Sequence, residues 1–305
     1  MTAPVVAPPV LDQIADGVHA YVQPDGGWCL NNAGLIVGDG VTVLVDTAAT
    51  EHRTRLLREA VEGVAPGGPD FVVNTHFHGD HTFGNGQFVP RATIVAHEGT
   101  RSDSAEAGLA LRGLWPGVEW GETPLTLPTL TFSEGMTLHA GGLTVELLNV
   151  GPAHTAADVV AWVPERSVLF TGDVAWSGVT PYVLMGSLSG SLRALRRLRK
   201  LGARTVVPGH GPVGGPEVLD RTEAYLRRLG RLAEEGIRDG LTVLEAAERA
   251  DLGEFGALLD GERLVGNLHR AYAEAQGLAP GARIDVHASF LEMVRFHGGL
   301  PACHA

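Results

Sequence analysis

Short runs of apolar and β-branched residues recur along the first two thirds of the chain, separated by glycine, proline and polar residues. These runs predict buried strands at 34–37, 41–46, 71–74, 92–97, 143–150, 159–163, 167–170 and 204–208. Residues 51–64 instead space their apolar side chains helically, and Pro66-Gly67-Gly68 is expected to end that helix. Strands that alternate with helical and loop segments predict an α/β core.

The pattern changes after Pro216. Residues 225–240, 241–253 and 258–276 show helical periodicity with almost no strand signal between them. We therefore predict a catalytic core over residues 1–214 and a helical C-terminal region, 215–305, packed on that core.

Metal-binding residue types follow the predicted strand 71–74 directly. His76 and His78 are two residues apart, so in an extended segment both imidazoles point the same way, as two ligands of one metal must. Gly79 then allows a turn that brings Asp80 and His81 to a neighbouring position. Three histidines and an aspartate within six residues favour a metal site over a solvated polar turn.

Three further candidates obey the same rule, since His154, Asp173 and His210 each follow a predicted strand by a few positions. Taken alone, either histidine would more often be a residue without a metal-binding role. Their shared position after strands changes this expectation, because the carboxyl ends of strands commonly form the rim of an active site. Asp46 and Asp158 are expected to accept the free N–H of metal-bound imidazoles. The alternative for both is an ordinary surface carboxylate.

Charge and composition narrow the function. The 35 acidic and 23 basic residues give a net charge of −12, which disfavours a nucleic-acid partner. The first residues lack a basic n-region and no apolar run approaches a membrane span, so we expect a cytoplasmic protein without membrane contact. Cys29 and Cys303 could pair, but two free thiols fit a reducing compartment better.

The segment His76-Phe77-His78-Gly79-Asp80-His81 resembles the His-x-His-x-Asp-His motif of the metallo-β-lactamase superfamily. The resemblance covers roughly residues 15–214 and implies an αββα sandwich. It also implies two metal ions, with zinc expected and iron or manganese as alternatives. The implied ligands are His76, His78 and His154 for the first ion, Asp80, His81 and His210 for the second, and Asp173 as the bridge. An aspartate at the bridging position resembles the branches that act on thioesters, lactones and nucleic acids.

Segments outside the motif, at 26–29, 110–122, 177–187, 267–274 and 296–303, resemble the actinorhodin-type second-ring polyketide cyclases. That resemblance implies aldol ring closure in antibiotic biosynthesis, with thioester hydrolysis of a polyketide delivered by an acyl carrier protein. Asp80 and Asp173 are then the catalytic carboxylates. Flat substrates favour aromatic walls, and the residues expected to provide them are Trp28, Trp115, Trp176 and Tyr182.

Other functions remain in competition with the cyclase. The main rival is a general thioesterase or lactonase of the same superfamily. A nuclease is disfavoured by the net charge, and an inert metal-binding or docking module is disfavoured because all seven candidate ligands are present. The sequence leaves the oligomeric state, the substrate and the native metal open.

Overall fold

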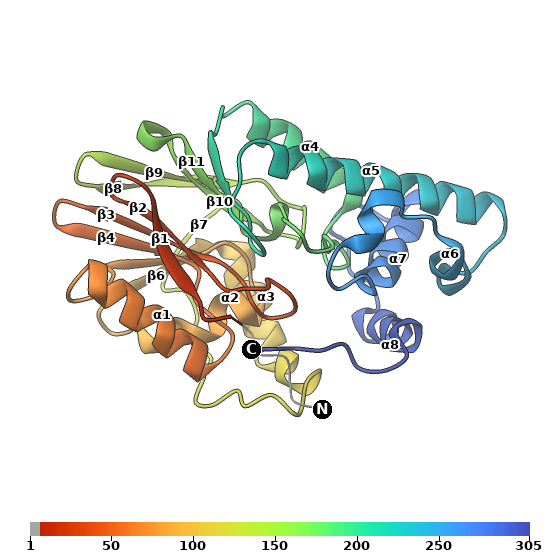
Figure 1. Cartoon of the computed structure of the whole chain (residues 1–305), viewed down its shortest axis with the longest axis horizontal. Helices are drawn as coiled ribbons and strands as arrows, with labels where there is room; N and C mark the ends of the chain where they lie inside the picture. The colour runs from red at the N-terminus through yellow and green to blue at the C-terminus, as the bar shows by residue number, and fades with distance from the viewer. Residues whose placement is uncertain (1–6) are drawn as a thin grey trace.

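Two β-sheets packed face to face form the centre of the molecule in this computed structural model, which describes residues 7–305 (Figure 1). The larger sheet has seven strands in chain order. They are β1 (Val10–Ala15), β2 (Val18–Val22), β3 (Ala33–Gly38), β4 (Val41–Val45), β5 (Phe71–Asn74), β6 (Thr93–His97) and β7 (Leu130–Phe132). The pairs from β1 to β4 are antiparallel and those from β4 to β7 are parallel.

The second sheet has five strands in the order β12-β11-β10-β9-β8. They are β8 (Gly135–Ala140), β9 (Leu143–Asn149), β10 (Val159–Val163), β11 (Val168–Phe170) and β12 (Thr205–Val207). Because β9 and β11 each run antiparallel to β10, and β12 runs parallel to β11, three of these strands end at the same edge.

Helices cover the outer faces of both sheets (Figure 1). In the core they are α1 (Glu51–Val64), α2 (Gly79–Thr82), α3 (Glu98–Ala107) and α4 (Leu188–Arg199). After residue 214 come α5 (Glu217–Arg238), α6 (Val243–Arg249), α7 (Arg263–Ala275) and α8 (Val286–His297). Thr50 caps α1 by accepting a hydrogen bond from Arg53 N, and Pro66-Gly67-Gly68 follows the helix end as predicted.

Alternating strand residues divide the core into layers. Val159, Ala161 and Val163 of β10 face the other sheet, while Val160 and Trp162 pack under the helices on the opposite face. Burial on both faces explains why β10 reads as a continuous apolar run rather than as an alternating one.

The αββα sandwich that the resemblance implied and the helical C-terminal region that the periodicity predicted are both confirmed. The predicted strands lie within about a residue of the observed bounds, and the helix at 51–64 matches α1. Four strands escaped prediction, namely β1, β2, β7 and β8, as did helices α3 and α8. β1 lies at a sheet edge and has no fully buried position, so its alternation is weak, whereas β8 does alternate, with Leu138 and Ala140 buried, and its signal was missed. No helix within residues 7–305 is long and apolar enough to cross a membrane.

Candidate metal centre

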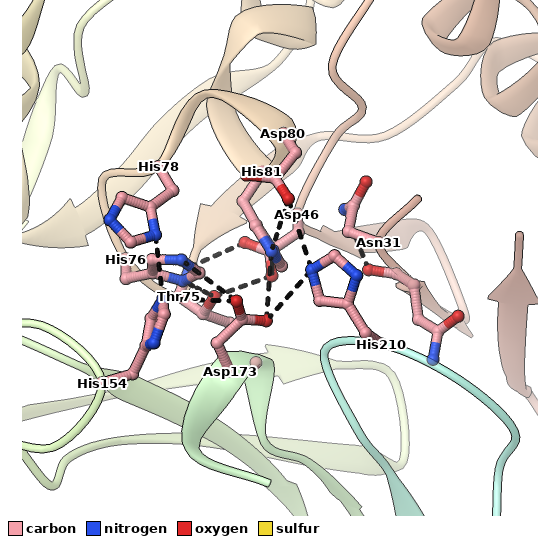
Figure 2. A network of polar contacts seen from close by, with 12 residues as sticks. Asn31, Asp46, Thr75, His76, His78, Asp80, His81, His154, Asp173 and His210 are labelled. Atoms are coloured by element: carbon pink, nitrogen blue, oxygen red, sulfur yellow. Dashed lines mark hydrogen bonds and ion pairs between the residues drawn. The ribbon is translucent and has the colours of Figure 1, made fainter. Parts of the chain in front are cut away.

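Seven side chains from four loops converge at one edge of the sandwich (Figure 2). The loops follow strands β5, β9, β11 and β12, whose carboxyl ends meet at this edge, with the short helix α2 continuing the loop after β5. Two groups result: the first cluster is His76, His78, His154 and Asp173, and the second cluster is Asp80, His81 and His210. All seven residues predicted from the sequence as ligands are therefore brought together.

The first cluster has three ring nitrogens facing one carboxylate oxygen. His154 Nε2 lies 2.8 Å from His78 Nδ1 and 3.3 Å from Asp173 Oδ2. His76 Nε2 lies 3.8 Å from the same oxygen. Ligands about 2.0–2.1 Å from a tetrahedral zinc ion stand roughly 3.3 Å apart, so this spacing suits one ion.

The second cluster uses the other oxygen of the same carboxylate. Asp173 Oδ1 is 3.2 Å from His81 Nε2 and 3.6 Å from His210 Nε2, while Asp80 Oδ2 is 3.3 Å from His210 Nε2. Asp173 therefore stands between the two clusters with one oxygen toward each (Figure 2). Gly209 permits this, because a Cβ at that position would stand 1.9 Å from Asp173 Oδ1.

Unpartnered atoms at the centre fit a pair of metal ions. His76 Nε2, His81 Nε2 and Asp173 Oδ1 are buried without a hydrogen-bond partner among residues 7–305. Buried polar atoms are costly unless they are satisfied, and here they point to a common centre. Imidazole and carboxylate ligands without thiolate suit zinc, and also iron or manganese.

Burial and the local charges favour the protonation states in which His76, His78 and Asp173 can bind a metal ion. Burial holds the pKa of His76 well below its usual range and lowers that of His78 to about 3. Burial opposes ionisation of Asp173, but His210 and His81 outweigh it and hold its pKa well below normal. His76 and His78 are therefore neutral and Asp173 is ionised, as coordination requires.

His81 differs from the other two histidines of its motif. Burial alone would lower its pKa, but Asp173, Asp46 and Asp80 together raise it well above normal. A metal ion bound by the second cluster must therefore displace a proton from His81.

Core residues orient three of the imidazoles. Asp46, directly after β4, accepts from His81 Nδ1 at 2.9 Å and from the backbone N–H of Thr75 at 2.8 Å. Thr75 Oγ1 lies 3.1 Å from His76 Nδ1, and the carbonyl of Gly26 lies 2.9 Å from His210 Nδ1. The prediction for Asp46 agrees with this geometry.

The other two imidazoles rest on a single segment, residues 180–185. The carbonyl of Tyr182 lies 2.5 Å from His154 Nδ1, and Met185 Sδ lies 3.3 Å from His78 Nε2. The expectation for Asp158 was wrong, because its carboxylate does not reach the His154 ring. It accepts backbone N–H groups of Ala153 and Thr155 instead, and so shapes the loop that carries His154.

Helix α7 holds that segment in place with three side chains spaced along one face. Arg263 donates to the carbonyl of Thr180, and Asn267 both donates to Pro181 O and accepts from Val183 N. Arg270 donates from Nε to the carbonyl of Leu184 at 2.9 Å. Sequence reasoning missed these residues, since the bonds join positions more than 80 residues apart and end on backbone atoms.

A small apolar cavity of about 70 Å³, the metal chamber, opens onto both clusters. Trp28, Trp176 and Tyr182 line it as predicted, and Arg263 stacks between the two indoles with its guanidinium carbon 4.0 and 4.8 Å from their ring centroids. The prediction that Trp115 lines the pocket was wrong. Trp115 lies behind the chamber wall, with its ring centroid 5.3 Å from that of Trp28, and its indole N–H donates to the carbonyl of Pro301.

The C-terminal region completes the chamber wall, with Val286 and Phe290 of α8 opposite the metal-ligand loops. The last residues then return to the core, where His304 O accepts from Arg53. Cys29 and Cys303 come together there as free thiols, and their mutual contact raises the pKa of Cys29 and lowers that of Cys303.

An αββα sandwich with paired histidine and carboxylate clusters at one edge defines a class of metal-dependent hydrolases. The chain belongs to the metallo-β-lactamase superfamily, whose family model matches residues 26–210. It is 23% identical over 229 residues to a metallo-β-lactamase type 2 from Bacteroides fragilis, covering 72% of this chain and 85% of that protein.

Two further similarities mark the breadth of that family. A hydroxyacylglutathione hydrolase from Methylococcus capsulatus is 29% identical over 138 residues, which are 45% of either protein. The solved structure of a metallo-β-lactamase from Pontibacter korlensis shares the fold with a TM-score of 0.61 at 23% identity, covering 72% of this chain and 99% of that one.

Proposed function

We propose that this protein is a dinuclear metal hydrolase, with two zinc ions, that cleaves a thioester or lactone carrying a bulky apolar acyl group. The observation that carries the proposal is the position of Asp173, with one oxygen toward each of two clusters beneath an apolar chamber. Similarity to a hydroxyacylglutathione hydrolase supports a thioester.

The site residues have distinct roles in such a reaction. The two bound ions would supply Lewis acidity and activate a water as nucleophile. Asp80 lines the chamber, and although burial opposes its ionisation, His81 and His210 hold its pKa below normal. Its ionised carboxylate is thus a weak base that can orient the attacking water and receive its proton. Trp28, Trp176 and Tyr182 would exclude bulk water and hold the acyl group.

The test is a thioester assay on metal-loaded protein. We expect close to two zinc ions per chain and hydrolysis of aromatic acyl-N-acetylcysteamine thioesters in preference to acetyl thioester. One metal ion or none per chain would contradict the dinuclear site. We also expect negligible turnover of a chromogenic cephalosporin, because an aspartate, Asp173, stands between the two clusters and aromatic side chains wall the chamber. Turnover comparable with the thioester rate would contradict this substrate class.

A second candidate is ring closure in an aromatic polyketide delivered by an acyl carrier protein, as the similarity of five segments suggests. The aromatic wall favours it, since three aromatic side chains could hold a flat first ring beside the metal ions. Asp80 would then remove an acidic methylene proton between two carbonyls. A one-ring polyketide thioester should give a specific two-ring product, and chelator should abolish it. If the product mixture equals the enzyme-free control while the thioester is hydrolysed, only the first candidate remains.

A further inference from the structure

A second cavity lies beside the metal chamber and is much larger, at about 370 Å³; we call it the outer cavity. Met185 and Val286 line both cavities, so these two side chains form the partition between them. Phe77, between the ligands His76 and His78, also lines the outer cavity. A substrate that reaches the metal ions from the outer cavity must therefore pass Met185 and Val286.

The outer cavity contains an uncompensated buried charge. Arg270 of α7 lines it and is 0% exposed. Its Nε and Nη2 donate to the carbonyls of Leu184 and Ala282, whereas Nη1 is buried with no hydrogen-bond partner among residues 7–305. Arg263 on the same helix is paired with Asp260 at 2.7 Å, but no carboxylate of residues 7–305 lies within 4.0 Å of the Arg270 guanidinium.

Two acidic groups near the outer cavity are engaged elsewhere, and a third, Asp103, lines the cavity without an ion pair to Arg270 and has its pKa raised by burial. Glu106 pairs with Arg283 at the rim of the outer cavity. Glu274, one turn along α7, accepts from the backbone N–H groups of Leu188 and Ser189 at the start of α4. Burying a guanidinium without a counter-charge costs several kcal/mol, so a structural role alone explains its position poorly. Burial accordingly lowers the pKa of Arg270.

We propose that Arg270 binds an anionic oxygen of the substrate in the outer cavity while the scissile carbonyl passes Met185 to the metal ions. The substrate class is then an acyl thioester that carries a negative charge remote from its scissile bond. This deepens the proposed function and rests on it. A single guanidinium with one free nitrogen suits a monovalent carboxylate on the acyl chain. The alternative source of the same chemistry is the phosphate of a phosphopantetheine leaving group.

The test compares three thioesters of one aromatic acyl group in kcat/KM. The first carries a free carboxylate at the far end of the acyl chain, the second carries its methyl ester, and the third joins the neutral acyl group to phosphopantetheine. The variants are Arg270→Met, which keeps the length, and Arg270→Lys, which keeps the charge. Arg227→Met is the matched control, because it removes an exposed arginine that lines neither cavity.

We expect the wild type to favour one anionic substrate over the methyl ester by tenfold or more, chiefly through KM. Arg270→Met should abolish that preference, in addition to any loss common to all three substrates that follows from freeing the carbonyl of Leu184, while Arg270→Lys keeps part of the preference. The anionic substrate that loses its advantage identifies the source of the charge. An equal loss on all three substrates, or no loss on any, would overturn the proposal.

Calorimetry separates this proposal from the proposed function. If the wild type hydrolyses no thioester, the proposed function fails, and binding of phenylacetate and inorganic phosphate to metal-loaded protein decides the anion site. Tenfold weaker binding of only one of them to Arg270→Met supports the site, because a disturbed metal centre would weaken the binding of both anions. Unchanged binding of both would contradict it.

Discussion

The two halves of the metal centre are built alike but supported differently. In the second cluster, His81 and His210 are oriented by Asp46 and by the carbonyl of Gly26, both within the sandwich. In the first cluster, His154 and His78 rest on the segment 180–185, which helix α7 fastens from outside the sandwich. One half therefore depends on the sheets themselves, and the other on an added helical region that also walls the substrate cavities.

In the proposed reaction, this difference would couple substrate binding to metal binding on one side only. Three side chains of α7 serve different places: Arg270 lines the outer cavity, Arg263 lines the metal chamber, and Asn267 accepts a hydrogen bond from Val183 N in the segment 180–185 that orients His154. A change in α7 should therefore disturb the first cluster, whereas a change at the end of β4 should disturb the second. The predictions below test that division, from the largest expected effect to the smallest.

Asp173→Ala should affect both clusters at once, because it removes the carboxylate that has one oxygen toward each of them. We expect a loss of thioesterase activity greater than about a hundredfold, since losses near that size already follow from changes to groups that only support a ligand. Elemental analysis should find at most one metal ion per chain, with an unchanged circular dichroism spectrum. A fully active variant with two metal ions would show that Asp173 is not the bridge.

Asp46→Ala should weaken the second cluster selectively. Asp46 accepts from His81 and Thr75, and removal of such a partner costs about ten- to a hundredfold in metal affinity. Titration against a competing chelator should show one site weakened by that factor. Thr75 also contacts His76, which belongs to the first cluster. The metal affinity of the first cluster should therefore fall as well, but by much less. An equal loss of metal affinity at both sites would contradict the conclusion that the two clusters are supported independently.

Asn267→Ala should act on the first cluster instead. The variant leaves the buried N–H of Val183 unpaired, which costs about 1–3 kcal/mol of folding stability. It also loosens the backbone that orients His154. We expect affinity at one metal site to fall by less than about tenfold, the low end for such partners. Asp46→Ala/Asn267→Ala should then show additive effects on the two sites, and strong non-additivity would mean that the halves are coupled.

Trp115→Phe should have the smallest effect. It removes the donor to Pro301 O, which fastens the C-terminal tail, but it keeps an aromatic ring against Trp28. The loss of one such bond is worth about 1 kcal/mol, or a fall of roughly 2–4 °C in Tm for a chain of this size. Thioesterase activity should stay within twofold, because Trp115 lies behind the chamber wall. A large rise in KM would place it in contact with substrate after all.

Strand periodicity in the sequence was enough to place the candidate ligands at one sheet edge, and the family resemblance implied their division into two clusters and the sandwich. Apolar runs in the sequence show where strands end, and the candidate ligands follow these ends by a few residues. We could therefore infer that His76, His154 and His210 lie close together at one sheet edge. The same reasoning failed for Asp158, four residues from His154, because a short separation along the chain does not decide which hydrogen-bond partner a loop carboxylate faces.

The sequence by itself determined which residues meet at the metal edge, because local strand periodicity and short loops deliver them there whatever the rest of the chain does. Only the tertiary structure decided how each imidazole is held, which aromatic side chains form the wall, and that Arg270 is buried without a counter-charge. Those features depend on contacts between α7 or the C-terminal tail and segments 80 to 250 residues away. Many of these contacts end on backbone carbonyls, which every residue carries and no sequence pattern marks.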